Sequence, residues 1–285
     1  MKRFLAAWLA ALALAAQAYE VKDDAGFVTR FDAPPARMVS LLPSLTETAC
    51  ALGACERLVA VDRYSNWPAP VARLPQVGGG LDPNVEAIAA LRPDVVLTAT
   101  SSSAAVRLRA LGLKVVQLEP RTAADLRRVT ITLARTLQVD GADALMQRID
   151  AGVKAAAQSL PASAHGMRVY FEVSPAPFAA GRGSFIGELM DELGLVNVIG
   201  PELGPFPRIN PELVVRAAPS LIMASRGSLE DMQRRPGWPA LKAIREGRVC
   251  AFDAAERDAL VRPGPRMDEG ARLMARCVSE QMARP

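Results

Sequence analysis

One segment of this 285-residue chain occurs twice, and the repeat limits the folds that the chain can adopt. Glu86 stands seven residues before Pro93, and Glu212 stands seven residues before Pro219. In both copies the intervening residues have the spacing of a short amphipathic helix, and an apolar run follows the proline. Because proline cannot continue the hydrogen bonds of a helix, each copy predicts a helix and then a buried strand. The repeat therefore predicts two similar α/β lobes with a cleft between them.

Strand-like runs alternate with helical segments in both halves of the chain. The apolar runs lie at residues 37–42, 58–61, 95–98, 114–118, 167–173, 221–224 and 248–252. This alternation is typical of βαβ units, which build parallel sheets. Between the halves, residues 141–160 have the apolar spacing of a helix, about 30 Å long at roughly 1.5 Å per residue. We therefore predict an α/β fold with a first lobe at 19–140, a stiff connecting helix at 141–160 and a second lobe at 161–285.

A helix-start pattern follows the first predicted strand, where Ser44 stands three residues before Glu47. A serine followed at this distance by an acid is typical of a capping box, in which the two side chains bind backbone amides of the first turn. We therefore predict that Ser44 caps a helix that runs to about Leu52.

Residues 1–18 have the pattern of a secretory signal peptide. Lys2 and Arg3 precede the apolar run Phe4–Ala16, and small residues stand at 16 and 18. The run is shorter than the roughly 20 apolar residues that a membrane-spanning helix needs. No cysteine follows it closely, so a lipid anchor has no attachment point. We expect cleavage after Ala18 and a free periplasmic protein.

The charge of the chain gives no reason to expect a nucleic-acid partner. The formal net charge is +4, from 34 basic and 30 acidic residues. Removal of Lys2 and Arg3 with the signal leaves 32 basic residues and a charge of +2. No basic run interleaved with aromatic residues occurs, so the usual sequence footprint of nucleic-acid binding is missing.

Four cysteines in an exported chain allow disulfides, with three possible pairings. Cys250 lies in an apolar strand and Cys277 in the last helix, and we favour this pair. Cys50 and Cys55 flank a predicted helix end and form a second candidate pair. Buried free thiols are the alternative.

The sequence contains none of the common catalytic or metal-binding spacings. The one histidine, His165, lies in a polar link, and no Gly-x-Ser-x-Gly motif accompanies it. Neither a Cys-x-x-Cys nor a His-x-x-x-His pair occurs. We expect no enzymatic activity, no bound metal and no cofactor. Two lobes with a cleft instead indicate a binding protein.

Several motifs together resemble the periplasmic cobalamin-binding proteins of ABC importers. They are the two glutamate repeats and the segments Tyr64-Ser65-Asn66-Trp67-Pro68, Pro205-Phe206-Pro207 and Arg262-Pro263-Gly264-Pro265-Arg266. The resemblance covers nearly the whole mature chain. It implies two Rossmann-like lobes joined by a rigid backbone helix, with a corrinoid held in the cleft and little closure on binding. It also implies a monomer that delivers its ligand to an inner-membrane permease with its ATPase.

The resemblance assigns roles to particular residues. Glu86 and Glu212 correspond to surface acids that dock onto the permease. Tyr64 corresponds to a tyrosine that contacts cobalamin, and residues 258–262 correspond to a ligand-contacting loop of the second lobe. The ligand-binding residues that we expect are Pro43, Ser44, Tyr64, Trp67, Gly80, Phe206, Asp258, Ala259, Leu260, Val261 and Arg262.

The wider family also carries haem and ferric siderophores. Its haem-binding members have a tyrosine ligand soon after a Gln-Val-Gly segment, whereas here Gln76-Val77 is followed by Gly78-Gly79-Gly80. This difference argues against haem. The glycines either allow a bulky ligand to approach the backbone closely or form a tight turn. A ferric siderophore or another metal chelate is the alternative ligand. Its anionic oxygens would need basic side chains from among Arg63, Arg182, Arg208, Arg226, Arg262 and Arg266.

Overall fold

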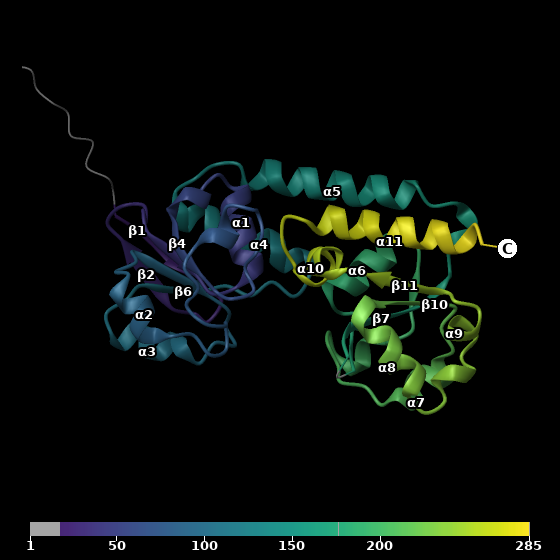
Figure 1. Ribbon diagram of the computed structural model, residues 1–285. Coiled ribbons are helices and arrows are strands. Elements are labelled where there is room, and N and C mark those ends of the chain that lie inside the picture. The colour runs from purple at the N-terminus through teal and green to yellow at the C-terminus, as the bar shows by residue number, and fades with distance from the viewer. Residues whose placement is uncertain (1–17, 176, 285) are drawn as a thin grey trace, which may run out of the picture.

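The computed structural model describes residues 18–175 and 177–284, which form two α/β lobes side by side (Figure 1). Each lobe contains a parallel sheet, so the predicted fold class is confirmed. The predicted signal peptide lies outside the described residues, apart from Ala18. Among the helices that the structure describes, none is both long enough and apolar enough to cross a membrane.

The first lobe is built on a four-stranded parallel sheet in the order β4-β3-β5-β6. A short antiparallel hairpin of β1 and β2 precedes it. The elements are β1 (Tyr19–Lys22), β2 (Val28–Phe31), β3 (Met38–Ser40), α1 (Pro43–Ala51), β4 (Leu58–Val61), α2 (Val85–Ala90), β5 (Val95–Thr98), α3 (Ala104–Ala110) and β6 (Val115–Gln117). The central strands β3 and β5 are buried along their whole length, because helices cover both faces of a parallel sheet.

The second lobe has a five-stranded sheet in the order β11-β10-β7-β8, with β9 also paired to β7. All its strand pairs are parallel except β7 with β8. The elements are β7 (Arg168–Ser174), β8 (Phe178–Ala179), α6 (Phe185–Glu192), β9 (Val196–Asn197), α7 (Pro211–Ala217), β10 (Leu221–Ser225), α8 (Leu229–Arg234), α9 (Lys242–Arg245), β11 (Val249–Phe252), α10 (Ala254–Val261) and α11 (Met267–Met282).

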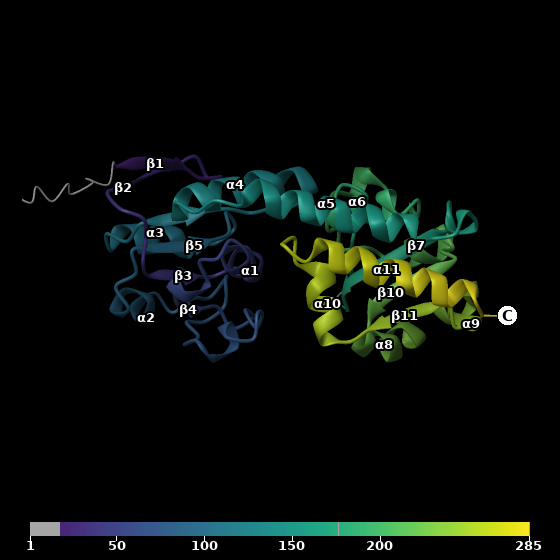
Figure 2. The same ribbon diagram turned by 90° about the horizontal axis from the view of Figure 1, so that it is seen from above.

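Three long helices lie where the lobes meet: α4 (Ala123–Leu137), α5 (Ala142–Gln158) and α11. Helix α5 leads from the first lobe into the second and runs alongside α11 in both views (Figures 1 and 2). One hydrophobic cluster continues from Leu45 of α1 through Ile149 of α5 to Leu273 of α11. The lobes therefore share a core instead of being tethered by a loose linker.

The sequence repeat reappears as one local structure in each lobe. Helices α2 and α7 begin after Asn84 and Asn210, whose side-chain oxygens accept backbone amides at 2.9 and 3.0 Å. In each copy the residue just before the proline, Arg92 or Ala218, has a left-handed backbone with φ of 47° or 43°. A left-handed residue ends a helix by turning the chain away from its axis. The stop signal thus acts one residue before the proline.

The predicted capping box at Ser44 is wrong. Helix α1 begins at Pro43 with Leu42 as its N-cap, and no side chain caps it. Proline is favoured at the first helical position because its missing amide has no helical partner there. Ser44 therefore falls inside the helix, and Glu47 is free to bind groups outside it.

Both candidate disulfides are present in the structure. Cys250 is bonded to Cys277 with a Cα–Cα distance of 6.0 Å, and Cys50 is bonded to Cys55 at 4.0 Å. The first closes a loop of 27 residues and the second a loop of 5. Every described cysteine therefore belongs to a disulfide.

The longer disulfide loop has the larger expected effect on stability. Replacing Cys250 and Cys277 by serine should lower the free energy of unfolding by about 3.5 kcal/mol, because the open chain gains more entropy. The Cys50 and Cys55 double variant should lose only about 2 kcal/mol. Urea denaturation of the two variants measures the difference, and a larger loss for the shorter loop would contradict this account.

Candidate functional site

A cavity of about 510 Å³ lies between the two lobes. Its size falls in the range of small-molecule sites, about 300–1,000 Å³. The first lobe contributes Leu42, Pro43, Ser44, Arg63, Tyr64 and Asn66, and the second contributes Ala254, Arg257, Asp258, Val261, Arg262 and Pro263. A second cavity of about 250 Å³ adjoins it and shares Leu42, Pro43 and Tyr64. The predicted interlobe cleft therefore has walls from both lobes.

The cavity walls lie just beyond the carboxyl ends of the strands. In the first lobe, residues 41–44 follow β3, residues 62–66 follow β4 and residues 99–101 follow β5. In the second lobe, α10 follows β11 directly. Parallel sheets present such loops at one edge, which is where α/β proteins bind their ligands.

The structure brings most of the predicted ligand-binding residues to these two cavities. They are Pro43, Ser44, Tyr64, Gly80, Asp258, Val261 and Arg262. Tyr64 is 59% exposed and borders both cavities. The guanidinium carbon of Arg63 lies 5.9 Å from the centre of its ring, and the exposed part of the ring is available to stack on a ligand. A Cβ atom at Gly80 would lie 2.8 Å from the carbonyl oxygen of Leu41. Glycine is therefore needed there for packing against the cavity floor.

The expectation of a loop at 258–262 is wrong, because residues 254–261 form helix α10 and Arg262 is its C-cap. Only one face of the helix lines the cavity, through Ala254, Arg257, Asp258 and Val261. Ala259 and Leu260 point into the core and are 2% and 0% exposed. The sequence reading missed Ala254 and Arg257. A capping box at Asp253 and Glu256 is the signal that could have revealed this helix.

Trp67 and Phe206 do not line either cavity. The guanidinium carbon of Arg266 lies 4.9 Å from the centre of the Trp67 ring, which is the geometry of a cation–π contact. The Phe206 ring lies 6.0 Å from that of Phe185 and packs against the hydrophobic core. The Phe206 ring is thus occupied in packing, whereas Trp67 holds Arg266 against its ring and remains 39% exposed.

A buried charged cluster crosses from one lobe to the other beside the cavity. Glu47 of α1 accepts hydrogen bonds from Arg262 Nη1 at 2.8 Å and from Arg266 Nε and Nη2 at 3.0 and 2.9 Å. The side chain of Glu47 is 1% exposed. Burial lowers the pKa of Arg266, but the hydrogen bonds and charge of Glu47 outweigh it, so the pKa is raised overall. Arg266 therefore remains charged, and both arginines bind Glu47 across the boundary between the lobes.

A second buried carboxylate, Asp62, fixes the loop that carries Tyr64. The hydroxyl of Ser65 donates to Asp62 Oδ1 at 2.5 Å, and the amide of Tyr64 donates to Oδ2 at 3.0 Å. Burial raises the pKa of Asp62, and these hydrogen bonds and the charge of Arg262 offset only part of the rise. Hydrogen bonds to Asp62 thus fix the backbone position of Tyr64.

The charges around the cleft are balanced. Four arginines, at 63, 257, 262 and 266, face four acidic residues, at 47, 62, 82 and 258. Arg63 pairs with Asp82 at 2.6 Å, and Arg257 pairs with Asp258 at 3.1 Å. Of the six arginines considered for a siderophore, only Arg63 and Arg262 line the larger cavity. The cleft therefore offers no excess positive charge to a strongly anionic ligand.

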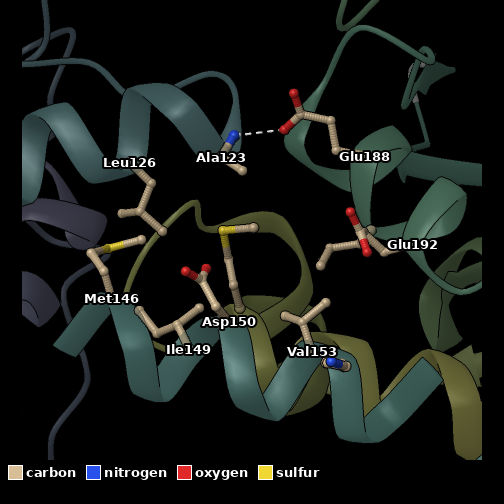
Figure 3. Close-up of a pocket in the computed structure, with 11 residues that line it drawn as sticks. Ala123, Leu126, Met146, Ile149, Asp150, Val153, Glu188 and Glu192 are labelled. Carbon is tan, nitrogen blue, oxygen red and sulfur yellow. Dashed lines mark hydrogen bonds between the residues drawn. The ribbon is translucent and has the colours of Figure 1, made fainter. Parts of the chain in front are cut away.

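A separate groove of about 560 Å³ lies where α4, α5 and α6 meet the start of α11 (Figure 3). Its walls include Leu126, Met146 and Val153, and within the described residues it contains none of the predicted ligand contacts. Glu188 at its rim accepts the backbone amide of Ala123 at 2.6 Å. This bond caps α4 from the other lobe, so the groove belongs to the junction of the lobes.

Glu86 and Glu212 lie apart from the cleft at equivalent positions, in the first turns of α2 and α7. Both are exposed, and Glu86 pairs loosely with Arg107 at 3.3 Å. In Figure 1 both helices lie on the side of the molecule away from α5.

Within residues 18–175 and 177–284, no group of three or more potential metal ligands occurs.

Comparisons with known proteins give similarities over most of the chain. The family model described as "Periplasmic binding protein" matches residues 38–256. A vitamin B12-binding protein of Vibrio cholerae serotype O1 is 27% identical over 241 residues, which are 82% of this chain and 85% of that protein. YvrC of Bacillus subtilis, an uncharacterized ABC transporter substrate-binding lipoprotein, is 26% identical over 258 residues, covering 86% and 80% of the two chains. The structure of the periplasmic haem-binding protein BhuT with two haems has a TM-score of 0.74 and 27% identity, covering 87% of this chain and 99% of BhuT.

Proposed function

This chain belongs to the periplasmic binding protein family, a family of binding proteins and not of enzymes, and we propose that it captures cobalamin or a related corrinoid. It is an extracytoplasmic substrate-binding protein of an ABC transporter. We propose that it acts in the periplasm as a monomer and passes its ligand to an inner-membrane permease and its ATPase. The similarity to a vitamin B12-binding protein supports this ligand class.

The observation that carries the proposal is the interlobe cavity with an exposed aromatic ring and balanced charges. A corrinoid is a broad macrocycle edged with neutral amide groups and carries little net charge. Tyr64 offers a flat apolar face to such a ring, with few rotatable bonds to freeze. The arginines around the cavity already have carboxylate partners, which would have to be displaced by an anionic ligand.

A ferric siderophore, haem or another metal chelate is the second candidate. Arg63 and Arg257 are 44% and 48% exposed, and such surface ion pairs contribute little, so each arginine could exchange its carboxylate for one on a ligand. The similarity to a haem-binding protein also supports this alternative. An anionic chelate requires the arginines of the cleft to exchange their carboxylate partners for those of the ligand. A corrinoid requires no such exchange.

Ligand titration distinguishes the two proposals. The purified protein should bind cyanocobalamin or cobinamide with a Kd below about 10 μM, and haem and ferric chelates more weakly. Trp67, beside the cleft, reports binding by fluorescence quenching. Tyr64→Ala should weaken binding at least about tenfold, or roughly 1.4 kcal/mol, through lost stacking. Phe27→Ala, which removes a similarly exposed ring from the β1–β2 turn, should leave the affinity unchanged. Tighter binding of a chelate than of any corrinoid would replace the first proposal with the second.

A further inference from the structure

The guanidinium group of Arg262 donates four hydrogen bonds within the protein, although Arg262 lines the cavity. Its Nη1 donates to Glu47 Oε1 and to Asn66 Oδ1, both at 2.8 Å. Its Nη2 donates to the carbonyl oxygen of Tyr64 at 2.9 Å and to Asp258 Oδ2 at 2.7 Å. A guanidinium has five N–H donors, so these four bonds leave one for any other partner.

Two of these partners, the carbonyl oxygen of Tyr64 and the side chain of Asn66, lie in the loop that presents the aromatic ring. Tyr64 and Asn66 belong to the first lobe, whereas Arg262 and Asp258 belong to the second. The amide of Asn66 also donates to Asp258 Oδ2 at 2.9 Å, which closes a ring of hydrogen bonds between Asn66, Arg262 and Asp258. The loop at 64–66 is therefore held by Asp62 from its own lobe and by Arg262 from the opposite one.

The planar fork of arginine is well suited to this task. It reaches two acceptors on the loop and two carboxylates at once, and lysine, with one compact ammonium group, could not reproduce that geometry. The side chain is 10% exposed and its bonds to Glu47 and Asp258 are partly buried, whereas its bonds to Asn66 and Tyr64 face solvent. The two carboxylates therefore fix the guanidinium beside the loop.

We infer that Arg262 is a positioning residue: it holds the Tyr64 loop in its ligand-receiving position from across the cleft and does not itself bind the ligand. This inference rests on the proposed function, because it assigns Tyr64 a ligand contact. It replaces the role of direct ligand contact that the sequence resemblance implies for Arg262. If only a fraction of molecules keep the loop in place, the apparent affinity falls to that fraction of its intrinsic value.

The first test needs no ligand. In the apo protein, Arg262→Gln should speed amide hydrogen exchange in residues 62–67 by at least about tenfold, because the loop opens more often. Amides in β5 serve as the internal reference for any general loss of stability. Arg257→Gln is the matched control, because Arg257 lies on α10, which Arg262 caps, and bonds the same Asp258, but its side chain has no described hydrogen bond to the loop. Unchanged exchange in Arg262→Gln would overturn the inference whatever the ligand is.

Asn66→Ala gives a second route if Arg262→Gln does not fold. It removes the loop side of the hydrogen-bond ring and leaves the pairing of Arg262 with Glu47 intact. The same faster exchange in residues 62–67 is expected. Protection equal to that of the unchanged protein would again contradict the inference.

A double-mutant cycle with cyanocobalamin then separates positioning from direct contact. Arg262→Gln should weaken binding about tenfold when Tyr64 is present and by less than about twofold in the Tyr64→Ala background. Additive effects would mean that Arg262 contacts the ligand independently and would overturn the inference. Absence of any corrinoid binding would refute the proposed function alone, because the hydrogen-exchange result stands without a ligand.

Discussion

A protein in which Glu86 and Glu212 are both replaced by alanine should bind its ligand normally but no longer support uptake. Each acid lies in the first turn of an exposed helix, one in each lobe, and neither lines the cleft. Exposed charges of this kind orient an encounter with an oppositely charged partner more than they add affinity. We propose that the two acids meet basic residues on the two halves of the permease. Loss of both should remove the productive orientation.

The docking prediction is measured as transport of labelled cyanocobalamin into cells or vesicles that contain the permease. The matched control is Glu56→Ala with Glu230→Ala, which removes the same charge from exposed first-turn acids in the same two lobes. The control should transport normally. Each first-turn acid stabilises its helix by only about 0.3–1 kcal/mol, so neither double variant should unfold. Normal uptake by the Glu86 and Glu212 variant would falsify the docking assignment.

Replacing Glu47 by glutamine should lower the free energy of unfolding by about 3–5 kcal/mol, the usual loss when one partner of a buried ion pair is removed. Arg262 and Arg266 would then keep two buried positive charges with less than their present compensation. The neutral amide fills nearly the same volume, so the effect measures charge and hydrogen bonding more than packing. Because the cluster joins the lobes, the variant should also unfold them less cooperatively.

Urea denaturation followed by circular dichroism and by Trp238 fluorescence measures this loss, since Trp238 is buried in the second lobe. The control is Glu56→Gln, at an exposed acid shortly after α1, the helix that carries Glu47. It should change the free energy of unfolding by no more than about 0.5 kcal/mol. Adding Arg266→Met to Glu47→Gln should restore part of the loss, because it removes one uncompensated charge. Equal stability of Glu47→Gln and Glu56→Gln would show that the cluster contributes nothing to folding.

Much of the fold could be predicted because its signals are local. The spacing of apolar residues gave the strands β5 and β10, and the pattern at 141–160 corresponds to α5. The two copies of the glutamate repeat became α2 and α7 with the same caps and the same left-handed ends. Their permease-docking role stays a prediction. Helix α10 was missed because it has only two turns. The three-and-four spacing of its cavity-facing residues is therefore too short to stand out in the sequence.

The site was harder to predict than the fold, because residue type alone does not say which face of an element a residue occupies. Ala259 and Leu260 follow Asp258 directly, yet they point into the core. Trp67 suits a ligand stack, but Arg266 already covers its ring. Such outcomes depend on what packs against each side chain, which is set by distant parts of the chain.

The sequence by itself determined two α/β lobes, the helix that joins them and the repeated acid on each lobe, because helix and strand periodicities and caps act over a few residues. Only the tertiary structure decided the role of Glu47. Its spacing from Ser44 is that of a capping residue, but its partners, Arg262 and Arg266, lie more than 200 residues away. A buried charge bonds whichever opposite charge the packing brings within hydrogen-bonding reach, and only the packing of α1 against residues 262–266, between α10 and α11, brings these arginines there.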